Sequence, residues 1–305
     1  MNFLNLIRWK NLLMIAFVQL LVKYAYLDPY GVQLSLTPLG ITLLILATIS
    51  IAAAGNIIND IYDVETDTIN KPNKLIIGKS ISEKTAYNMF IAFNVIGVGL
   101  GFYVSHLVGK SPFFSIFVVI SVLLYVYATY LKRTLLIGNI VISVLVALSL
   151  IVVGVFELLP TITPNNQHLQ LAFFKTIFNY AIFAFAINLL REIAKDIEDI
   201  DGDHKAGMNT LPIAIGRERA TNILFVLSLI PLFAIIYYTV DSLYESQIAV
   251  IYFLVFIIGP LFYLSIKIFM AKTKKDYHHI SNMLKLVMLF GMLSLLLYKY
   301  IFLNN

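Results

Sequence analysis

The sequence predicts an all-α polytopic membrane protein with nine transmembrane helices, and three observations support this fold class. Hydrophobic residues make up 60% of the 305 positions and charged residues 13%, with a mean hydropathy of +0.86. A soluble domain is nearer ~45–50% apolar and ~25% charged, so this chain has too little polar surface to cover a globule in water. Its apolar residues form runs near the ~20 residues that cross a bilayer as a helix, instead of the ~10-residue alternating segments of a membrane barrel.

The apolar runs give the helices in chain order. The first run follows Arg8 and Lys10, and no small-residue cleavage site comes after it, so we expect a retained helix and no signal peptide. Gly138 and Asn139 lie early in the fifth run, where a small residue beside a polar one favours close helix packing. Prolines inside the seventh and eighth runs predict kinks, which membrane helices tolerate. The predicted spans are 11–28, 37–58, 85–107, 112–131, 134–158, 171–190, 219–240, 246–268 and 282–303.

The distribution of Lys and Arg between the loops predicts the orientation. The connections at 28–36, 159–170 and 240–245 contain neither residue, and 108–111 contains only Lys110, whereas the alternate connections are all basic. Because basic loops stay on the cytoplasmic side, we expect a cytoplasmic N-terminus and an outside C-terminus. We expect the lipid bilayer of the cell (plasma) membrane as the environment. The net charge of +5 is then explained by the basic cytoplasmic loops that set the orientation in the membrane. No nucleic-acid partner is expected.

Two polar stretches, at about 59–84 and 191–218, repeat each other on the predicted cytoplasmic side. Residues 59–67 align without gaps with 195–203 at an offset of 136, and four of the nine positions are identical, three of them aspartates. Internal repeats in membrane proteins commonly place a ligand site at the interface between the two copies. We therefore expect a single domain, 1–305, with pseudo-repeat halves of about 1–133 and 134–305 and one shared cytoplasmic site.

The spacing within both copies predicts a metal-assisted anion site. If the helices continue, Asn59, Asp63 and Asp67 share one face, and Asp199 and Asp203 share another. Such carboxylates repel each other unless a cation lies between them. In a chain without cysteine, hard oxygen ligands favour Mg²⁺. Basic side chains beside the acids indicate an anionic ligand such as a diphosphate. These are Lys71, Lys74, Arg191, Lys195 and Lys205.

Other interpretations of the acidic stretches stay open. Acids at helix ends are often ordinary solvated groups, and a cation transporter also places acids between repeats. A transporter needs them near mid-membrane, whereas these stand at span ends beside lysines. A non-enzymatic lipid-binding or scaffold role is a further alternative. His278 and His279, in a basic loop, are expected to be a solvated pair without an acidic partner.

At these motifs the chain resembles the UbiA superfamily of intramembrane prenyltransferases. The first motif is Asn59-Asp60-x-x-Asp63-x-x-x-Asp67, followed by Asn70-Lys71-Pro72-Asn73-Lys74. The second is Lys195-Asp196-x-x-Asp199-x-x-x-Asp203-x-Lys205. The stretch Tyr127-x-x-x-Leu131-Lys132-Arg133 is also similar to the family. Lys71 and Lys74 depart from the arginines of many members, and lysine lacks the bidentate geometry of arginine toward phosphate.

The resemblance implies a Mg²⁺-dependent reaction of a prenyl diphosphate donor with a lipophilic acceptor. Its implied metal ligands are Asn59, Asp63, Asp67, Asp199 and Asp203, with Asp60 and Asp196 supporting or ligating. Its implied catalytic residues are Asp63, Asp199, Lys195 and Tyr127. Its implied substrate-binding residues are Lys71, Lys74, Lys132, Arg133, Arg191, Lys205, Asn56 and Tyr130. Tyr127 and Tyr130 would stabilise an allylic cation through their ring faces, or else serve as interfacial anchors.

Within the superfamily, the segments around Gly55-Asn56 and Arg191-Glu192 most resemble the digeranylgeranylglyceryl phosphate synthases. Those enzymes transfer a geranylgeranyl group to geranylgeranylglyceryl phosphate. The resemblance therefore implies a phosphoglyceryl ether acceptor, with an aromatic acceptor (4-hydroxybenzoate, dihydroxynaphthoate or homogentisate type) or a porphyrin as the alternative. An acceptor with its own phosphate needs additional basic residues, and we expect neutralisation of Lys132 or Arg133 to raise the KM for the acceptor, the prenyl donor or both.

Overall fold

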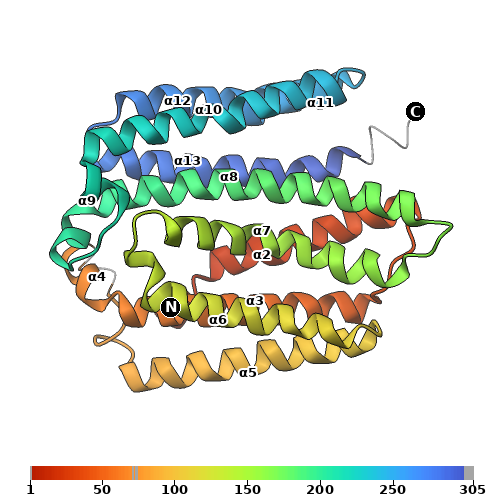
Figure 1. The fold of residues 1–305 in the computed structure, drawn as a ribbon, viewed down its shortest axis with the longest axis horizontal. Coiled ribbons are helices and arrows are strands. Elements are labelled where there is room, and N and C mark those ends of the chain that lie inside the picture. Colours follow the sequence, from red (N-terminus) through yellow and green to blue (C-terminus); the bar gives the residue numbers. More distant parts are fainter. Residues whose placement is uncertain (1, 71, 73–74, 299–305) are drawn as a thin grey trace.

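The computed structural model describes residues 2–70, 72 and 75–298, and within them the regular structure is helical apart from one isolated bridge between Ile77 and Ile81. The long helices run alongside one another as a bundle (Figure 1). The helices are α1 (Asn2–Leu6), α2 (Trp9–Leu20), α3 (Pro38–Tyr62), α4 (Val64–Asn70), α5 (Glu83–Leu107), α6 (Phe114–Thr129), α7 (Ile137–Leu158), α8 (Gln167–Lys205), α9 (Leu211–Ile215), α10 (Arg217–Ser242), α11 (Gln247–Phe253), α12 (Gly259–Met270) and α13 (Lys274–Leu293).

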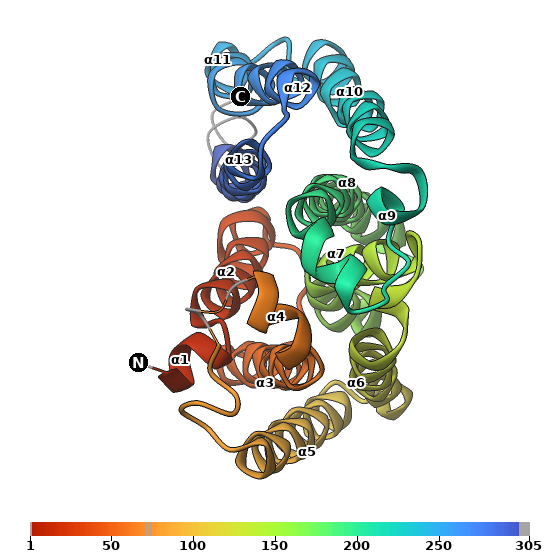
Figure 2. The same cartoon turned by 90° about the vertical axis from the view of Figure 1, so that its left-hand side faces the viewer.

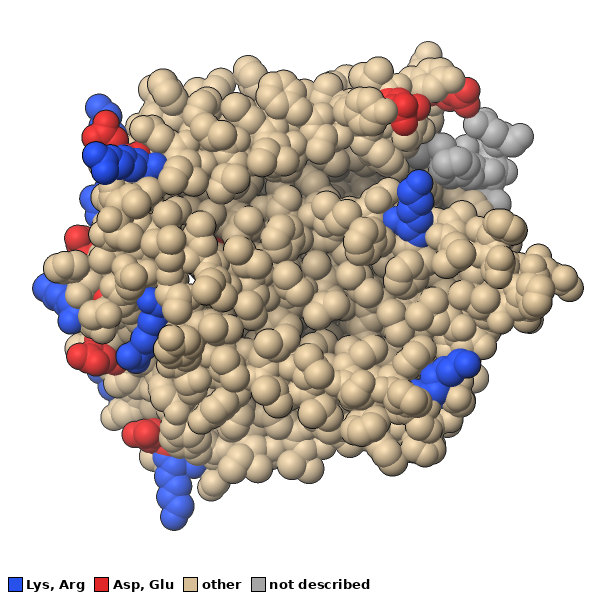
Figure 3. All heavy atoms as spheres, in the orientation of Figure 1, with Lys and Arg blue, Asp and Glu red and all other residues tan. Residues whose placement is uncertain are grey.

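The described part of the chain contains nine helical segments that are long and apolar enough to cross a membrane, which confirms the predicted number. Short π or 3-10 turns extend several α-helices within these segments, so that the first runs over Trp9–Tyr30 and the eighth over Gln247–Met270. Charged side chains gather at the two ends of the molecule, and a broad uncharged band lies between them (Figure 3). The chain is thus an integral membrane protein.

Two segments differ from the predicted bounds by more than four residues, each for a local reason. The sixth continues to Lys205, well beyond the predicted end at 190, because buried Ile193, Ala194 and Ile197 extend its apolar stripe through the polar sequence. The ninth begins at Lys274 instead of 282, because Thr273 and Asp276 form a capping box that starts the helix early. Residues 299–303 of the ninth predicted span lie outside the described residues.

The helices form a ring when viewed along their axes (Figure 2). α3 packs against α5 and α6, α7 against α8, and α8 against α13. The apolar window of α3 is 61% buried within the protein and that of α6 only 11%, so α3 is an inner helix and most of the α6 surface lies on the outside of the bundle. Both acidic stretches lie at the end of the bundle that carries α4 and α9, at the left of Figure 1, which we call the motif end.

Candidate active site

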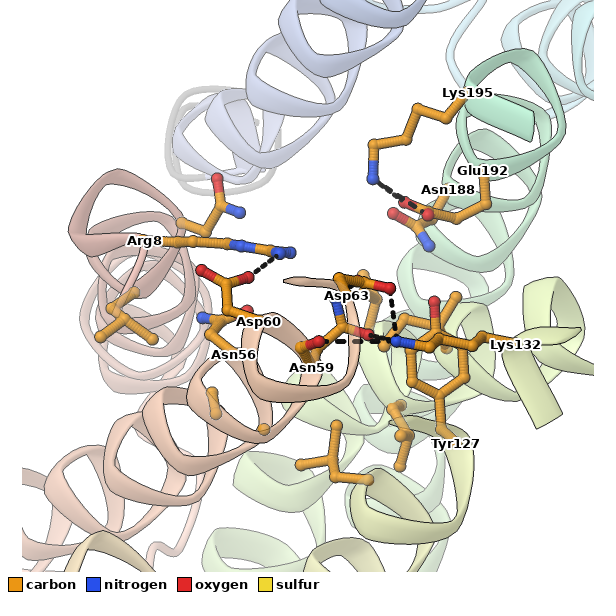
Figure 4. A pocket seen from close by; sticks show the side chains of 18 of the residues that line it. Arg8, Asn56, Asn59, Asp60, Asp63, Tyr127, Lys132, Asn188, Glu192 and Lys195 are labelled. Atoms are coloured by element: carbon orange, nitrogen blue, oxygen red, sulfur yellow. Dashed lines mark hydrogen bonds and ion pairs between the residues drawn. The ribbon is translucent and has the colours of Figure 1, made fainter. Parts of the chain in front are cut away.

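A cavity of about 1000 Å³ lies among the inner helices at the motif end, and Figure 4 shows its polar part. Its lining comes from α1, α2, α3, α4, α6, α7, α8 and α13 and from segments that connect them. Both acidic motifs contribute to it, so two stretches 136 residues apart do meet in one place. The predicted site residues that line the cavity are Asn56, Asn59, Asp60, Asp63, Asp67, Tyr127, Lys132, Arg191, Lys195, Asp196, Asp199 and Asp203.

The first motif keeps its helical spacing although α3 ends at Tyr62. Asp63 leaves helical geometry (φ −95°, ψ 0°), yet its N–H donates to the carbonyl of Asn59 at 2.9 Å, and the N–H of Asp67 donates to the carbonyl of Asp63 at 2.7 Å. The Asn59 amide donates to Asp63 Oδ2 at 2.5 Å, and Lys132 Nζ lies 2.6 Å from Asp63 Oδ1. Burial lowers the pKa of Lys132, although the charge of Asp63 opposes this effect.

Asp60 forms an ion pair with Arg8, a residue outside the acidic motif. Arg8 Nη2 lies 2.7 Å from Asp60 Oδ1, and the nearby Asn56 amide donates to the carbonyl of Ile7 at 3.0 Å. Arg8 is the single described non-glycine residue with positive φ, at +52°, and this left-handed turn separates α1 from α2. Burial alone would lower the pKa of Arg8, but the charge of Asp60 and its hydrogen bond raise it overall.

The second motif lies on α8, which continues as an unbroken helix through Asp203 to Lys205 and so places Asp199 and Asp203 on one helical face. The amide of Asn139, on the neighbouring helix α7, donates to Asp196 Oδ2 at 2.8 Å. Asp199 Oδ1 lies 3.8 Å from the ammonium of Lys274 at the start of α13. Asp60 and Asp196, which occupy equivalent positions in the two motifs, are therefore each held by a polar side chain of another segment.

Glu192, one turn before the second motif, holds two of the predicted cationic residues. Its carboxylate lies 3.0 Å from Lys195 Nζ and 2.9 Å from Arg191 Nη1, and Glu192 and Lys195 face the first motif across the cavity (Figure 4). Ion pairing at this distance fixes the long lysine side chain at the cavity wall. Sequence reasoning gave Glu192 no role of its own, since an acid three residues before a lysine on a helix usually forms an ordinary surface pair.

Asn70 joins the two motifs directly. Its amide nitrogen donates to the Asp199 carbonyl at 3.1 Å and contacts Asp203 Oδ1 at 3.4 Å, and its oxygen accepts from the Gly202 N–H at 3.1 Å. A Cβ atom on Gly202 would lie 2.4 Å from the Asn70 side chain, so this close approach requires glycine. We call these contacts the Asn70 clasp. Asn70 follows the first motif in the sequence and Gly202 lies within the second, but only the packing of α4 on α8 reveals their link.

Some predicted residues lie away from this cavity. Tyr130 is 66% exposed, because the chain leaves the α6 helix there (φ −133°) while Tyr127 stays on the inward face. Arg133 and Lys205 are exposed, and the described cavity lining includes neither. The structure therefore places Tyr130, Arg133 and Lys205 outside the lining of this cavity, and their contact with substrate stays a prediction. The predictions for Lys71 and Lys74 fall on residues outside those described.

The solvated-pair prediction for the two histidines needs correction. His278 Nδ1 lies 3.0 Å from Glu198 Oε1, so this histidine does have an acidic partner. His279 Nε2 lies 3.1 Å from the Tyr263 hydroxyl. The prediction was wrong because α13 packs on α8 over most of its length, which brings residues 80 positions apart together.

The carboxylates of the cavity suit a Mg²⁺ ion that is also coordinated by the oxygens of a bound diphosphate. The described residues contain no group of three or more His, Asp or Glu side chains close enough to enclose a metal ion by themselves. Mg²⁺ typically uses one or two carboxylates and completes its shell with water and substrate phosphate oxygens. Aspartates from α3, α4 and α8 line one cavity together with Lys132 and Lys195, and this arrangement matches that mode of binding.

The chain is similar over nearly its full length to digeranylgeranylglyceryl phosphate synthases. It is 30% identical to the Methanosphaera stadtmanae enzyme over 297 residues, which cover 96% of this chain and 97% of that one. It is 30% identical to the Korarchaeum cryptofilum enzyme over 248 residues, which cover 80% of each.

Solved structures share the fold. One is of a digeranylgeranylglyceryl phosphate synthase, with a TM-score of 0.64, 23% identity and coverage of 97% of this chain and 98% of that chain. Another is of a UbiA homolog from Archaeoglobus fulgidus bound to GPP and Mg²⁺, with a TM-score of 0.56, 18% identity and coverage of 97% and 99%. The sequence profile of the UbiA prenyltransferase family matches residues 20–289. The chain therefore belongs to the UbiA prenyltransferase family.

Proposed function

We propose that this prenyltransferase moves a geranylgeranyl group from its diphosphate to geranylgeranylglyceryl phosphate in a Mg²⁺-dependent reaction. The observation that carries the proposal is the meeting of both acidic motifs at one cavity that continues into an apolar interior, where Lys132 pairs with Asp63 and Lys195 with Glu192. The full-length relatives named for this activity support the choice of acceptor.

The polar end of the cavity supplies the ligands for the diphosphate. We assign the Mg²⁺ ligands to the side chains of Asn59, Asp63, Asp67, Asp199 and Asp203. Asp60 and Asp196 would support them, because Arg8 and Asn139 already hold these two carboxylates. When bound, Mg²⁺ would neutralise diphosphate oxygens and so make the diphosphate a better leaving group.

The remaining polar residues act on charge that develops during the reaction. Departure of the diphosphate breaks the bond from its oxygen to C1 of the prenyl group and increases negative charge on the leaving oxygens. Lys132 and Lys195 line the same cavity and are held by Asp63 and Glu192, so they can stabilise that charge without reorganising. The acceptor hydroxyl oxygen then bonds to C1, and its proton passes to the departing diphosphate. Tyr127 lines the cavity and offers its ring face to the allylic cation.

The apolar part of the cavity fits an isoprenoid chain. Ile51 of α3, Phe117, Ile120 and Leu124 of α6, and Val152 of α7 line it. Burial of hydrocarbon contributes about 0.8 kcal/mol per CH₂ group, so a long prenyl tail would add much of the donor's binding free energy.

The orientation in the plasma membrane is also proposed. Basic loops at the motif end support a cytoplasmic active site and N-terminus, with the C-terminus outside. The repeated acidic motifs support a single domain with halves of about 1–133 and 134–305.

The direct test is to incubate the purified protein with labelled geranylgeranyl diphosphate, Mg²⁺ and single acceptors, and to identify products by mass. We expect transfer to geranylgeranylglyceryl phosphate. Transfer to 4-hydroxybenzoate or dihydroxynaphthoate instead would overturn the acceptor and leave the family unchanged.

A further inference from the structure

One corner of the cavity, where α2, α8 and α13 meet, carries more positive than negative charge. Lys285 of α13 lines this corner, and its Nζ donates to Asn11 Oδ1 at 2.7 Å. Among the described residues, no acid lies within ion-pair distance of Lys285. Arg8, Lys132 and Lys195, which line the same cavity, are each paired with a carboxylate.

Arg191, on α8, adds a second cation to this corner. Its Nη1 pairs with Glu192, but that carboxylate also holds Lys195, so one negative charge serves two positive charges. The Nε–H of Arg191 is buried, and no described residue accepts its hydrogen bond. A buried donor without an acceptor destabilises the protein, and an anionic oxygen at this point would satisfy it. The corner therefore offers a built environment for an anion.

A second, apolar cavity of about 120 Å³ opens from the same corner. It shares Asn11, Asn188, Arg191 and Lys285 with the main cavity and continues between α2, α7, α8 and α13. Its deeper lining is apolar or aromatic and consists of Met14, Val18, Leu150, Tyr180, Phe183, Met288 and Met292. Two cations beside an apolar pocket match an amphiphile with an anionic head and a hydrocarbon chain.

We propose that Arg191 and Lys285 bind the phosphate of the acceptor, and that the apolar pocket receives the beginning of its isoprenoid chain. This inference rests on the proposed function. The donor diphosphate then binds at the acidic motifs, and the acceptor phosphate binds at separate cations on the α8–α13 side. Lys285 thereby becomes a specificity residue that distinguishes a phosphorylated acceptor from a neutral one. The sequence motifs include Arg191 but give Lys285 no role.

The test compares Lys285→Gln with Lys285→Arg and with Lys275→Gln, a change of an exposed lysine on the same helix. We expect Lys285→Gln to raise the KM for geranylgeranylglyceryl phosphate about tenfold or more, because a charge-assisted hydrogen bond contributes ~1.5–3 kcal/mol and 1.4 kcal/mol is tenfold. The KM for geranylgeranyl diphosphate should change less than about twofold. Lys285→Arg should retain most of the acceptor affinity, and Lys275→Gln should behave as the wild type.

Direct binding separates this inference from the proposed function. In metal-free nanodiscs, the wild type should bind geranylgeranylglyceryl phosphate more tightly than geranylgeranylglycerol, and Lys285→Gln should lose this preference. That result supports the subsite even if the wild type transfers the prenyl group to another acceptor. Equal affinity of the wild type for both ligands, or an unchanged preference in Lys285→Gln, would overturn it. Displacement of the phosphate ligand by phosphatidylglycerol but not phosphatidylcholine would assign the corner to bilayer lipids and overturn the acceptor role.

Discussion

Replacing Gly202 by alanine should impair prenyl transfer by breaking the Asn70 clasp. The added Cβ would lie 2.4 Å from the Asn70 side chain, which must then give up its contacts with Gly202, Asp199 and Asp203. Each hydrogen bond contributes ~0.5–1.5 kcal/mol, so loss of all three weakens the link between the motifs by about 1.5–4.5 kcal/mol. Alanine itself favours a helix interior by ~1 kcal/mol over glycine, so α8 should not unfold.

The expected loss of kcat is about 10- to 100-fold, since a displacement of about 1 Å of catalytic groups can cost ~100-fold. The value of kcat is measured as the steady-state rate of prenyl transfer at saturating concentrations of donor and acceptor. Gly99→Ala on α5 is the matched control, because a Cβ there meets no atom within 4 Å. Asn70→Ala supplies the critical comparison: once the clasp is absent, Gly202→Ala should add little further loss. Wild-type activity of Gly202→Ala, or full additivity with Asn70→Ala, would refute the reasoning.

Three further predictions concern the main cavity. EDTA should abolish transfer and Mg²⁺ should restore it, since the acidic motifs need the metal to bind diphosphate. Asp63→Ala and Asp199→Ala should each remove nearly all activity, and the double variant should lose little more, because the motifs act as a unit. Lys132→Gln should lower kcat at least tenfold, because its ammonium lies 2.6 Å from Asp63 in the cavity, whereas Arg133→Gln should change it less than about twofold.

A different outcome would contradict each of these three predictions. Undiminished turnover in metal-free buffer would contradict metal dependence. Two modest losses that multiply in the double aspartate variant would indicate separate sites in place of one. Equal losses in Lys132→Gln and Arg133→Gln would mean that the position of Lys132 inside the cavity has no special importance. Thermal unfolding of every variant in the same detergent checks that the fold is retained.

The helices could be predicted from the sequence because their signal is local. Runs of apolar residues fix the number of spans, and the predicted ends mostly agree with the structure. The predicted start of α13 was wrong because the Thr273 capping box begins that helix earlier. The predicted end of α8 was wrong because buried apolar residues continue its apolar stripe through a polar stretch.

The acidic half of the site could also be predicted, because the motifs repeat at a fixed offset. Its supporting contacts could not, since they depend on tertiary packing between distant segments. Arg8 was visible only as a basic residue before the first span, and its left-handed conformation brings it to Asp60. Lys285 lies in an apolar helix without a motif, and only the assembled bundle shows that it faces the cavity beside Arg191.

The central claim is that one cavity uses both acidic motifs to transfer a geranylgeranyl group to a phosphoglyceryl ether acceptor. Mass spectrometry of the product formed from geranylgeranyl diphosphate and geranylgeranylglyceryl phosphate, with wild type beside Asp63→Ala and Asp199→Ala, tests it most directly. The account predicts a Mg²⁺-dependent diether phosphate product with the wild type and nearly none with either variant. Absence of that product with the wild type, or its undiminished formation by either variant, would contradict the account.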